Sequence, residues 1–202
     1  MILAEGLIDP SRREWLVGEN GPYEGVQVGV IFLALILGVF ILARMKGAAG
    51  WLYGWIGLAV LGCLYIFGEE ISWGQHILSW NTPEYWAHIN DQNETNLHNT
   101  SSWLDQKPRL IMIIGIYAGG LMVPVLARFK PHLLPVKFNI IYPPAIMAIT
   151  AGICLFTRIT DMVAEYTDFI FFARAAETEE FFIFYFVFLY LLVMKNRLID
   201  RR

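Results

Sequence analysis

The chain has 202 residues, of which 56% are hydrophobic and 16% are charged, with a formal net charge of −3. Soluble domains are about 45–50% apolar and about 25% charged, so this composition excludes a disordered chain and a basic nucleic-acid-binding protein. Two cysteines are too few for a disulfide-stapled secreted domain. Because the apolar residues lie in long blocks, the sequence predicts an all-α, polytopic membrane protein.

Five apolar blocks are long enough, or nearly so, to cross about 30 Å of hydrocarbon, which takes about 20 helical residues. The fifth has an uncharged core of only 14 residues, Phe181 to Met194. That core measures about 21 Å, so we expect its helix to extend upstream through three glutamates. In one domain covering 1–202, the predicted spans are 26–43, 51–70, 109–127, 140–158 and 173–194.

Lysine and arginine residues predict the orientation, because cytoplasmic loops are enriched in them. They occur in the links after the first and third spans and in the C-terminal tail: Arg44, Lys46, Arg128, Lys130, Lys137, Lys195, Arg197, Arg201 and Arg202. With five spans these regions share one side, so the N-terminus is predicted outside and the C-terminus inside. Residues 1–25 then form an acidic extracytoplasmic segment. This pattern suits a bacterial inner (plasma) membrane.

The outer connection between the second and third spans, residues 71–107, is far longer than the usual loop of about 4–6 residues, and long loops are often functional. Two carboxylates, Glu69 and Glu70, immediately precede it. It contains three of the four histidines, and Glu94 and His98 share a face if their stretch is helical. We therefore expect a partly helical, functional outer loop.

Two segments of this loop are expected to be helical. Residues 71–80 are interpreted as a continuation of the second span or as an amphipathic helix at the membrane interface. Thr82 and Pro83 are typical of a helix start, with Thr82 as the cap and Pro83 in the first turn. The tryptophans that cluster near the ends of the spans indicate an interfacial aromatic belt.

The extended fifth span carries acidic residues at membrane depth, where ionisable groups are costly and usually face partners or water. Glu177 and Glu180 are spaced i, i+3 and share a face, whereas Glu179 is expected to point elsewhere, toward Arg174 or the headgroups. Arg158 is the expected counter-charge for a buried glutamate. An ion-paired structural network is the alternative interpretation. The secondary candidates are Asp161 and Glu165.

Imidazoles beside several carboxylates suit a divalent transition metal: Zn, Fe or Mn. The predicted catalytic residues are Glu69 and Glu70, and the predicted metal ligands are His76, Glu94, His98, Glu177 and Glu180. In a hydrolytic version, Glu and His ligate the metal and a spare Glu moves the proton. In an oxidative version, two irons lie among the glutamates.

The stretch GEEISWGQ, residues 68–75, resembles part of the signature of the CAAX-protease and Abi family of intramembrane proteases. That signature begins Glu-Glu-x-x-x-Arg, and its first Glu activates water. The resemblance implies a general base at Glu69 or Glu70 and a supporting donor at His98. Gly74 stands where the family has Arg, and the family's later Phe-x-x-x-His and His-x-x-x-Asn motifs are absent.

Together these features predict an integral membrane enzyme acting on a lipid or membrane-embedded substrate at the extracytoplasmic interface, with no nucleic-acid partner. Two other classes stay open. One is an accessory subunit or assembly factor that docks a membrane-protein partner through the outer loop. The other is a proton- or cation-coupled transporter with Glu177 or Glu180 as the relay, although no inverted repeat typical of transporters is visible.

Overall fold

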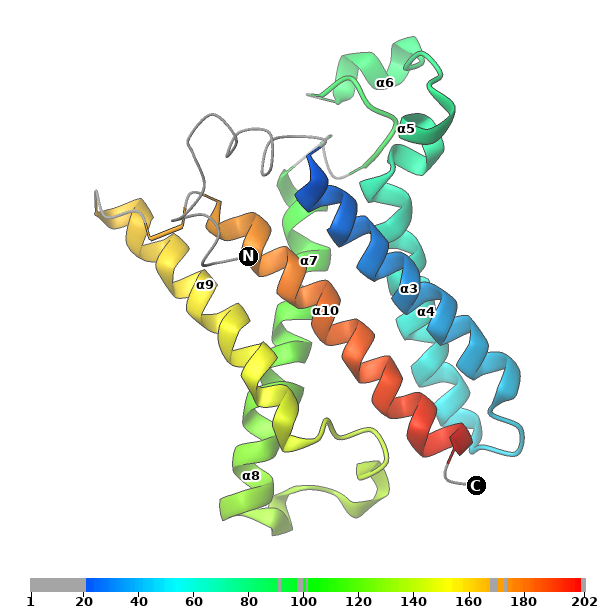
Figure 1. Cartoon of the computed structure of the whole chain (residues 1–202), viewed down its shortest axis with the longest axis vertical. Coiled ribbons are helices and arrows are strands. Elements are labelled where there is room, and N and C mark those ends of the chain that lie inside the picture. Colours follow the sequence, from blue (N-terminus) through cyan, green and yellow to red (C-terminus); the bar gives the residue numbers. More distant parts are fainter. Residues whose placement is uncertain are drawn as a thin grey trace. The chain divides into compact units, whose positions relative to one another are not determined.

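The computed structural model describes residues 21–90, 92–97, 100, 102–167, 171–172 and 174–200. These residues form helices and turns and no strand. Within them, five helical segments are long and apolar enough to cross a membrane, as predicted (Figure 1). The five segments are Pro22–Arg44, Gly50–Glu70, Lys107–Phe129, Ala145–Tyr166 and Ala175–Asp200. The chain is thus all-helical over its described part, as expected of an integral membrane protein.

The chain divides into two compact units. The first comprises Met1–Val30 and Ile116–Tyr190, and the second comprises Ile31–Gly115 and Leu191–Arg202. Of the predicted acidic segment 1–25, residues 1–20 lie outside the described residues, and Pro22 already begins a helix.

In the second unit, the part of α3 (Pro22–Arg44) that follows Val30 packs against α4 (Gly50–Glu70) as an antiparallel pair, blue and cyan in Figure 1. A Cβ atom added at Gly38 would lie only 2.7 Å from a methyl group of Val60, so the glycine allows the two backbones to approach closely. The rings of Phe32 and Phe67 stack with their centroids 4.9 Å apart. Small and aromatic residues therefore close this helix pair along its length.

Large apolar side chains remain exposed along these helices. Leu58 and Leu61 on α4 are among the most exposed, and so is Ile111 on α7 (Ser102–Ile116). In water such surfaces would be costly, but lipid tails are as apolar as leucine side chains. Their exposure is what a helix facing lipid requires.

The third span consists of α7, a π-helical segment η3 (Tyr117–Met122) and α8 (Val123–Phe129). Pro124 in the first turn of α8 has no N–H to donate to the carbonyl of residue 120, and its ring crowds that carbonyl. A local π-helix relieves this conflict by widening the turn. The break in the α-helical pattern therefore follows from the sequence.

Gly120 in η3 is buried against α9 (Ala148–Tyr166) and α10 (Ala175–Lys195). A Cβ added there would lie 2.6 Å from the Cβ of Ala151 and 2.8 Å from the Phe186 ring. We therefore expect Gly120→Ala to lower the free energy of unfolding by about 1–3 kcal/mol. Gly115→Ala is the matched control, because nothing lies within 4 Å of its added Cβ. Equal unfolding midpoints for the two variants in detergent would contradict this packing.

The fourth span begins and ends later than its predicted bounds, 140–158. Residues 140–144 form turns, and the helical segment runs from Ala145 to Tyr166. Pro143 and Pro144 explain the late start, because proline cannot donate a helical hydrogen bond and disfavours helix in the residue before it. A short 3₁₀ turn, η6 (Ala145–Met147), then leads into α9.

The fifth span extends upstream of its apolar core, as predicted from a core that is too short to cross the hydrocarbon layer. Helix α10 begins at Ala175 and includes Glu177, Glu179 and Glu180. It continues at its other end into a π-helical segment, η7 (Asn196–Asp200). The hydroxyl of Tyr190 donates to the carbonyl of Ile141 at 2.9 Å, which ties α10 to the link before the fourth span.

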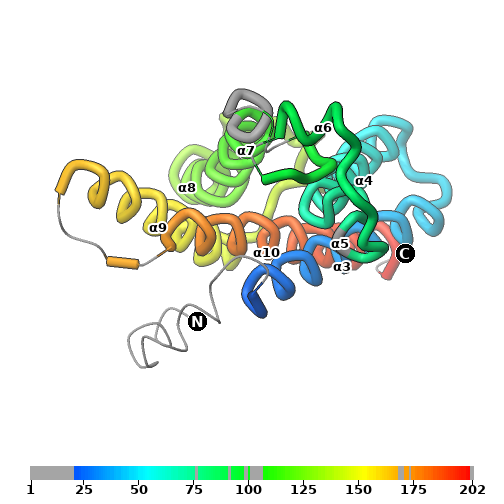
Figure 2. Tube along the Cα trace, turned by 90° about the horizontal axis from the view of Figure 1, so that it is seen from above, coloured from blue at the N-terminus to red at the C-terminus, as the bar shows by residue number. Residues whose placement is uncertain are grey.

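The chain does not continue α4 beyond Glu70, contrary to one predicted form of residues 71–80. Ser72, Trp73 and Gly74 have φ angles of 46°, 53° and 106°, so three successive residues adopt the left-handed region. Only glycine does so without strain. This turn, η1 (Ser72–Gly74), leads into a single helical turn, α5 (Gln75–Leu78) (Figures 1 and 2).

A second short helix, α6 (Glu84–Ile89), starts close to the predicted point. Its N-cap is Pro83, and no side chain caps it. The hydroxyl of Thr82, the predicted cap, donates instead to the carbonyl of Asn93. Thr82 therefore closes the loop rather than starting its helix.

Candidate functional site

Glu69 is buried at the end of α4. Its Oε1 accepts a hydrogen bond from the indole Nε1 of Trp73 at 2.7 Å, and its Oε2 accepts one from the backbone N–H of Leu97 at 2.7 Å. Both carboxylate oxygens are therefore used to hold separate parts of the loop. Hydrogen bonds to a charged group are stronger than neutral ones, so Glu69 anchors this loop to the helix.

The turn after α4 brings Trp73 back to Glu69. The Trp73 ring lies over Gly68, where an added Cβ would meet ring carbons at 2.9 Å. Gly68 thus supplies the space for the indole, and the left-handed backbone at Trp73 directs its ring toward the helix.

Three polar side chains meet beside this turn. The buried Ser72 donates through Oγ to Oε2 of Glu94 at 2.8 Å. The amide Nδ2 of Asn96 donates to the same carboxylate oxygen at 2.6 Å and to the Ser72 oxygen at 3.0 Å. Asn90 in turn donates to Oδ1 of Asn96 at 2.7 Å. Buried polar groups need such partners, and a network that supplies them is rigid.

Gln75 fastens the same loop from α5. Its Oε1 accepts from both the backbone N–H and the hydroxyl of Thr95, each at 2.7 Å. Its Nε2 donates to the hydroxyl of Thr82 at 2.7 Å. Glu69, Ser72 and Gln75, which are spaced three residues apart, thus each hold a residue of the later part of the loop. We call the following set the α4-end network: Glu69, Ser72, Gln75, Asn90, Glu94 and Asn96.

The structure brings Glu69 and Glu94, two predicted site residues, into this one network. Glu70 is half-buried at the last position of α4. Residues 94–97 are not helical, so the expectation that Glu94 shares a helix face with His98 is wrong for the residues that can be described. The backbone hydrogen bonds that helix would need are replaced by side-chain bonds to Asn90, whose Oδ1 accepts the N–H of Glu94 at 3.0 Å.

The predicted metal site needs two imidazole ligands, His76 and His98. The structure does not describe His98 or the side chain of His76. Across the side chains that are described, no three His, Cys, Asp or Glu groups come together as a metal ion requires. Metal binding at this loop therefore stays a prediction.

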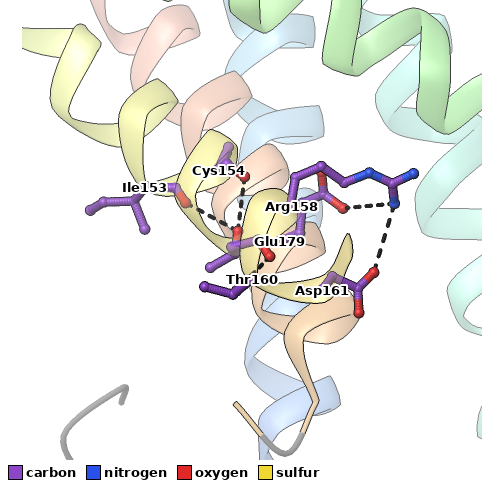
Figure 3. Close-up of polar contacts among 7 residues, drawn as sticks. Ile153, Cys154, Arg158, Thr160, Asp161 and Glu179 are labelled. Atoms are coloured by element: carbon purple, nitrogen blue, oxygen red, sulfur yellow. Dashed lines mark hydrogen bonds and ion pairs between the residues drawn. The ribbon is translucent and has the colours of Figure 1, made fainter. Parts of the chain in front are cut away.

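A second polar cluster lies in the first unit, between α9 and α10 (Figure 3). Glu179 is almost fully buried, and its Oε2 lies 3.8 Å from Nη1 of Arg158. Asp161 reaches the same nitrogen at 3.8 Å. Arg158 is thus the counter-charge of a buried glutamate, as predicted. The buried residue is Glu179, which corrects the expectation that it points toward Arg174 or the headgroups.

Glu177 is held at the same end of α10 by different groups. Its side chain pairs with Arg174 at 3.6 Å. Its backbone carbonyl accepts hydrogen bonds from the amide of the buried Gln27 at 2.8 Å and from the hydroxyl of Tyr23 at 3.2 Å. The start of α3 is therefore pinned to the start of α10. Glu180 is half-buried nearby in the sequence.

The predicted site residues thus fall into two groups. Glu69, Glu70 and Glu94 belong to the second unit, and Glu177 and Glu180 belong to the first. Of the secondary candidates, Asp161 pairs with Arg158, whereas Glu165 is exposed on α9.

Sequence reasoning missed Glu179 and the amide and hydroxyl members of the α4-end network. A signal for Glu179 exists, because Glu179, Ile183 and Phe186 follow one another at i, i+4 and i+7 and all are buried. Ser72 and Gln75 follow Glu69 at intervals of three residues, but no stripe of apolar residues accompanies them, and no spacing marks Asn96.

Comparisons with protein-family models, curated proteins and solved structures found no match for this chain. Its function must therefore be argued from the side chains. The α4-end network presents carboxylates in a rigid polar setting at the end of a membrane-crossing helix. Such groups can move protons or bind cations.

Proposed function

We propose that this chain is an integral membrane enzyme that acts on a lipid or membrane-embedded substrate through the carboxylates at the end of α4. The observation that supports this is Glu69, a buried carboxylate at the end of a membrane-crossing helix, held by Trp73 and Leu97. Ionisable groups at membrane depth usually serve a function. Strained backbone such as that at Ser72 and Trp73 also concentrates at functional sites.

The two neighbouring glutamates take different roles in this proposal. Both oxygens of Glu69 already accept an N–H group, so Glu69 positions the loop. Glu70, the next residue and half-buried, is the general base that moves the proton. Glu94 is held in place by Ser72 and Asn96.

The proposed cofactor is a divalent transition metal, Zn, Fe or Mn, because imidazole and carboxylate ligands together suit these ions. Within the outer loop, the proposed ligands are His76, Glu94 and His98. When bound, such a metal lowers the pKa of its water and supplies a nucleophile at neutral pH.

The proposed orientation places the loop on the extracytoplasmic side of a bacterial inner membrane. An odd number of spans puts the two termini on opposite sides. The lysines and arginines of the links after the first and third spans favour the cytoplasm, which leaves the α4-end network facing the exterior or periplasm.

The metal content of the purified protein tests this proposal. We expect one or two equivalents of a transition metal by elemental analysis, and loss of that metal in His98→Ala. His132→Ala is the matched control, because His132 lies in the other long link and should leave the metal in place. Wild-type protein without metal, or the same metal content in both variants, would contradict the proposed cofactor.

A second function is favoured by a specific observation. Four members of the α4-end network hydrogen-bond to one another, as they would in a purely structural loop: Ser72, Asn90, Glu94 and Asn96. We infer that the alternative is an accessory subunit or assembly factor whose loop docks a membrane-protein partner. Metal-free protein that co-purifies with one partner in a fixed ratio would favour this role over the enzyme.

A further inference from the structure

The length of α4 sets the depth of the segment that follows it. Its 21 residues measure about 31 Å at 1.5 Å per residue, which matches a hydrocarbon layer of about 30 Å. Glu70 therefore lies at the boundary of that layer. The Trp73 ring packs over Gly68, so this side chain lies level with the last turn of α4.

The chain from Trp73 to Trp80 exposes four large apolar side chains within eight residues. Leu78 is 73% exposed, Ile77 67%, Trp73 48% and Trp80 37%. Contiguous exposed apolar groups with polar neighbours mark interaction surfaces. Gln75 in the same segment is bound by the returning loop, whereas Ile77 and Leu78 are not covered by it.

We propose that residues 73–80 lie in the interface of the membrane that α4 crosses, with Ile77 and Leu78 inserted among the acyl chains. On the preceding helix α4, Leu58, Leu61 and Leu64 are exposed as well, as in a helix that faces lipid. The partner is thus the lipid bilayer itself. This surface is independent of whether the α4-end network is catalytic.

The two tryptophans strengthen the choice of lipid over a soluble partner. Indole rings are enriched at membrane interfaces because they are apolar with one polar N–H. The Trp73 N–H is held by Glu69 and the Trp80 N–H reaches Thr95 at 3.4 Å. Both polar atoms are therefore bound within the protein, the first to α4 and the second to the loop, which leaves the remaining ring surface for lipid.

Collision accessibility of a nitroxide label tests this proposal in protein reconstituted into phosphatidylcholine and phosphatidylglycerol vesicles. One cysteine is introduced as Leu78→Cys after Cys63→Ala and Cys154→Ala, and spectra are recorded with oxygen and with a water-soluble nickel chelate. Oxygen partitions into lipid and the chelate stays in water. We expect the oxygen-to-nickel ratio at residue 78 to be several-fold above that at Glu84→Cys, an exposed charged position on α6.

Leu61→Cys on α4 is the lipid-facing reference, and residue 78 should resemble it. A ratio at residue 78 equal to that at residue 84 would overturn the proposal, because it would place α5 in water. Low accessibility to both reagents would overturn it as well, since a second copy or another protein would then cover the segment. Circular dichroism of each variant confirms that the helices are retained.

Discussion

Replacing Arg158 with methionine should lower the free energy of unfolding by about 3 kcal/mol. The substitution removes the cation beside the buried carboxylate of Glu179, and breaking a buried ion pair in this way costs about 3–5 kcal/mol. We expect the lower end of that range, because the Arg158 side chain is itself 46% exposed. The measurement is reversible unfolding in mixed detergent micelles.

The double variant Arg158→Met with Glu179→Met separates the ion pair from general packing. Replacing both partners by apolar residues is often neutral or stabilising, so the double variant should recover most of the loss. Asp161→Asn is the control for the partly exposed partner and should change stability by no more than about 1 kcal/mol. A double variant as unstable as Arg158→Met alone would show that the charges do not act as a pair.

Glu69→Leu should release the loop from the end of α4. It leaves the N–H groups of Trp73 and Leu97 without their acceptor, and each hydrogen bond to a charged group contributes about 1.5–3 kcal/mol. Because about 1.4 kcal/mol is a factor of ten, we expect amide hydrogen exchange across residues 92–97 to accelerate more than tenfold. Exchange measured by mass spectrometry on the protein in micelles reports this directly.

Two further variants sharpen this result. Glu69→Gln keeps one carbonyl acceptor and should accelerate exchange less than leucine does. Glu84→Leu removes an exposed carboxylate from α6 and should leave residues 92–97 unchanged. If Glu69→Leu and Glu84→Leu gave the same exchange, Glu69 would not be the anchor of the loop.

The helices could be predicted from the sequence because a lipid-crossing segment needs a long apolar run, and that need is local. The start of the fourth helix could not be placed by the same reasoning. Ile140, Ile141 and Tyr142 extend the apolar run, yet Pro143 and Pro144 keep them outside the helix. The two prolines, rather than the hydropathy of the sequence, therefore determine where this helix begins.

Of the α4-end network, Glu69 and Glu94 could be picked out from the sequence, but their partners could not. The hydrogen bonds of Glu69 to Leu97 and of Glu94 to Ser72 join residues 28 and 22 positions apart, and no local pattern in the sequence shows such pairs. On α10 the spacing of Glu177 and Glu180 indicated a shared face without indicating which face α9 would cover. Packing selected Glu179 instead, on the same stripe as Ile183.

The bond between Glu69 and Leu97 also bears on the order of events during biosynthesis. The two residues are 28 positions apart, and a chain is made from its N-terminus. Glu69 therefore emerges well before its second donor exists, and until Leu97 has been made its carboxylate is bound only by water or by the nearby indole. The fastening of the loop to α4 is accordingly completed only once the chain has been made as far as Leu97, shortly before the third apolar span begins at Lys107.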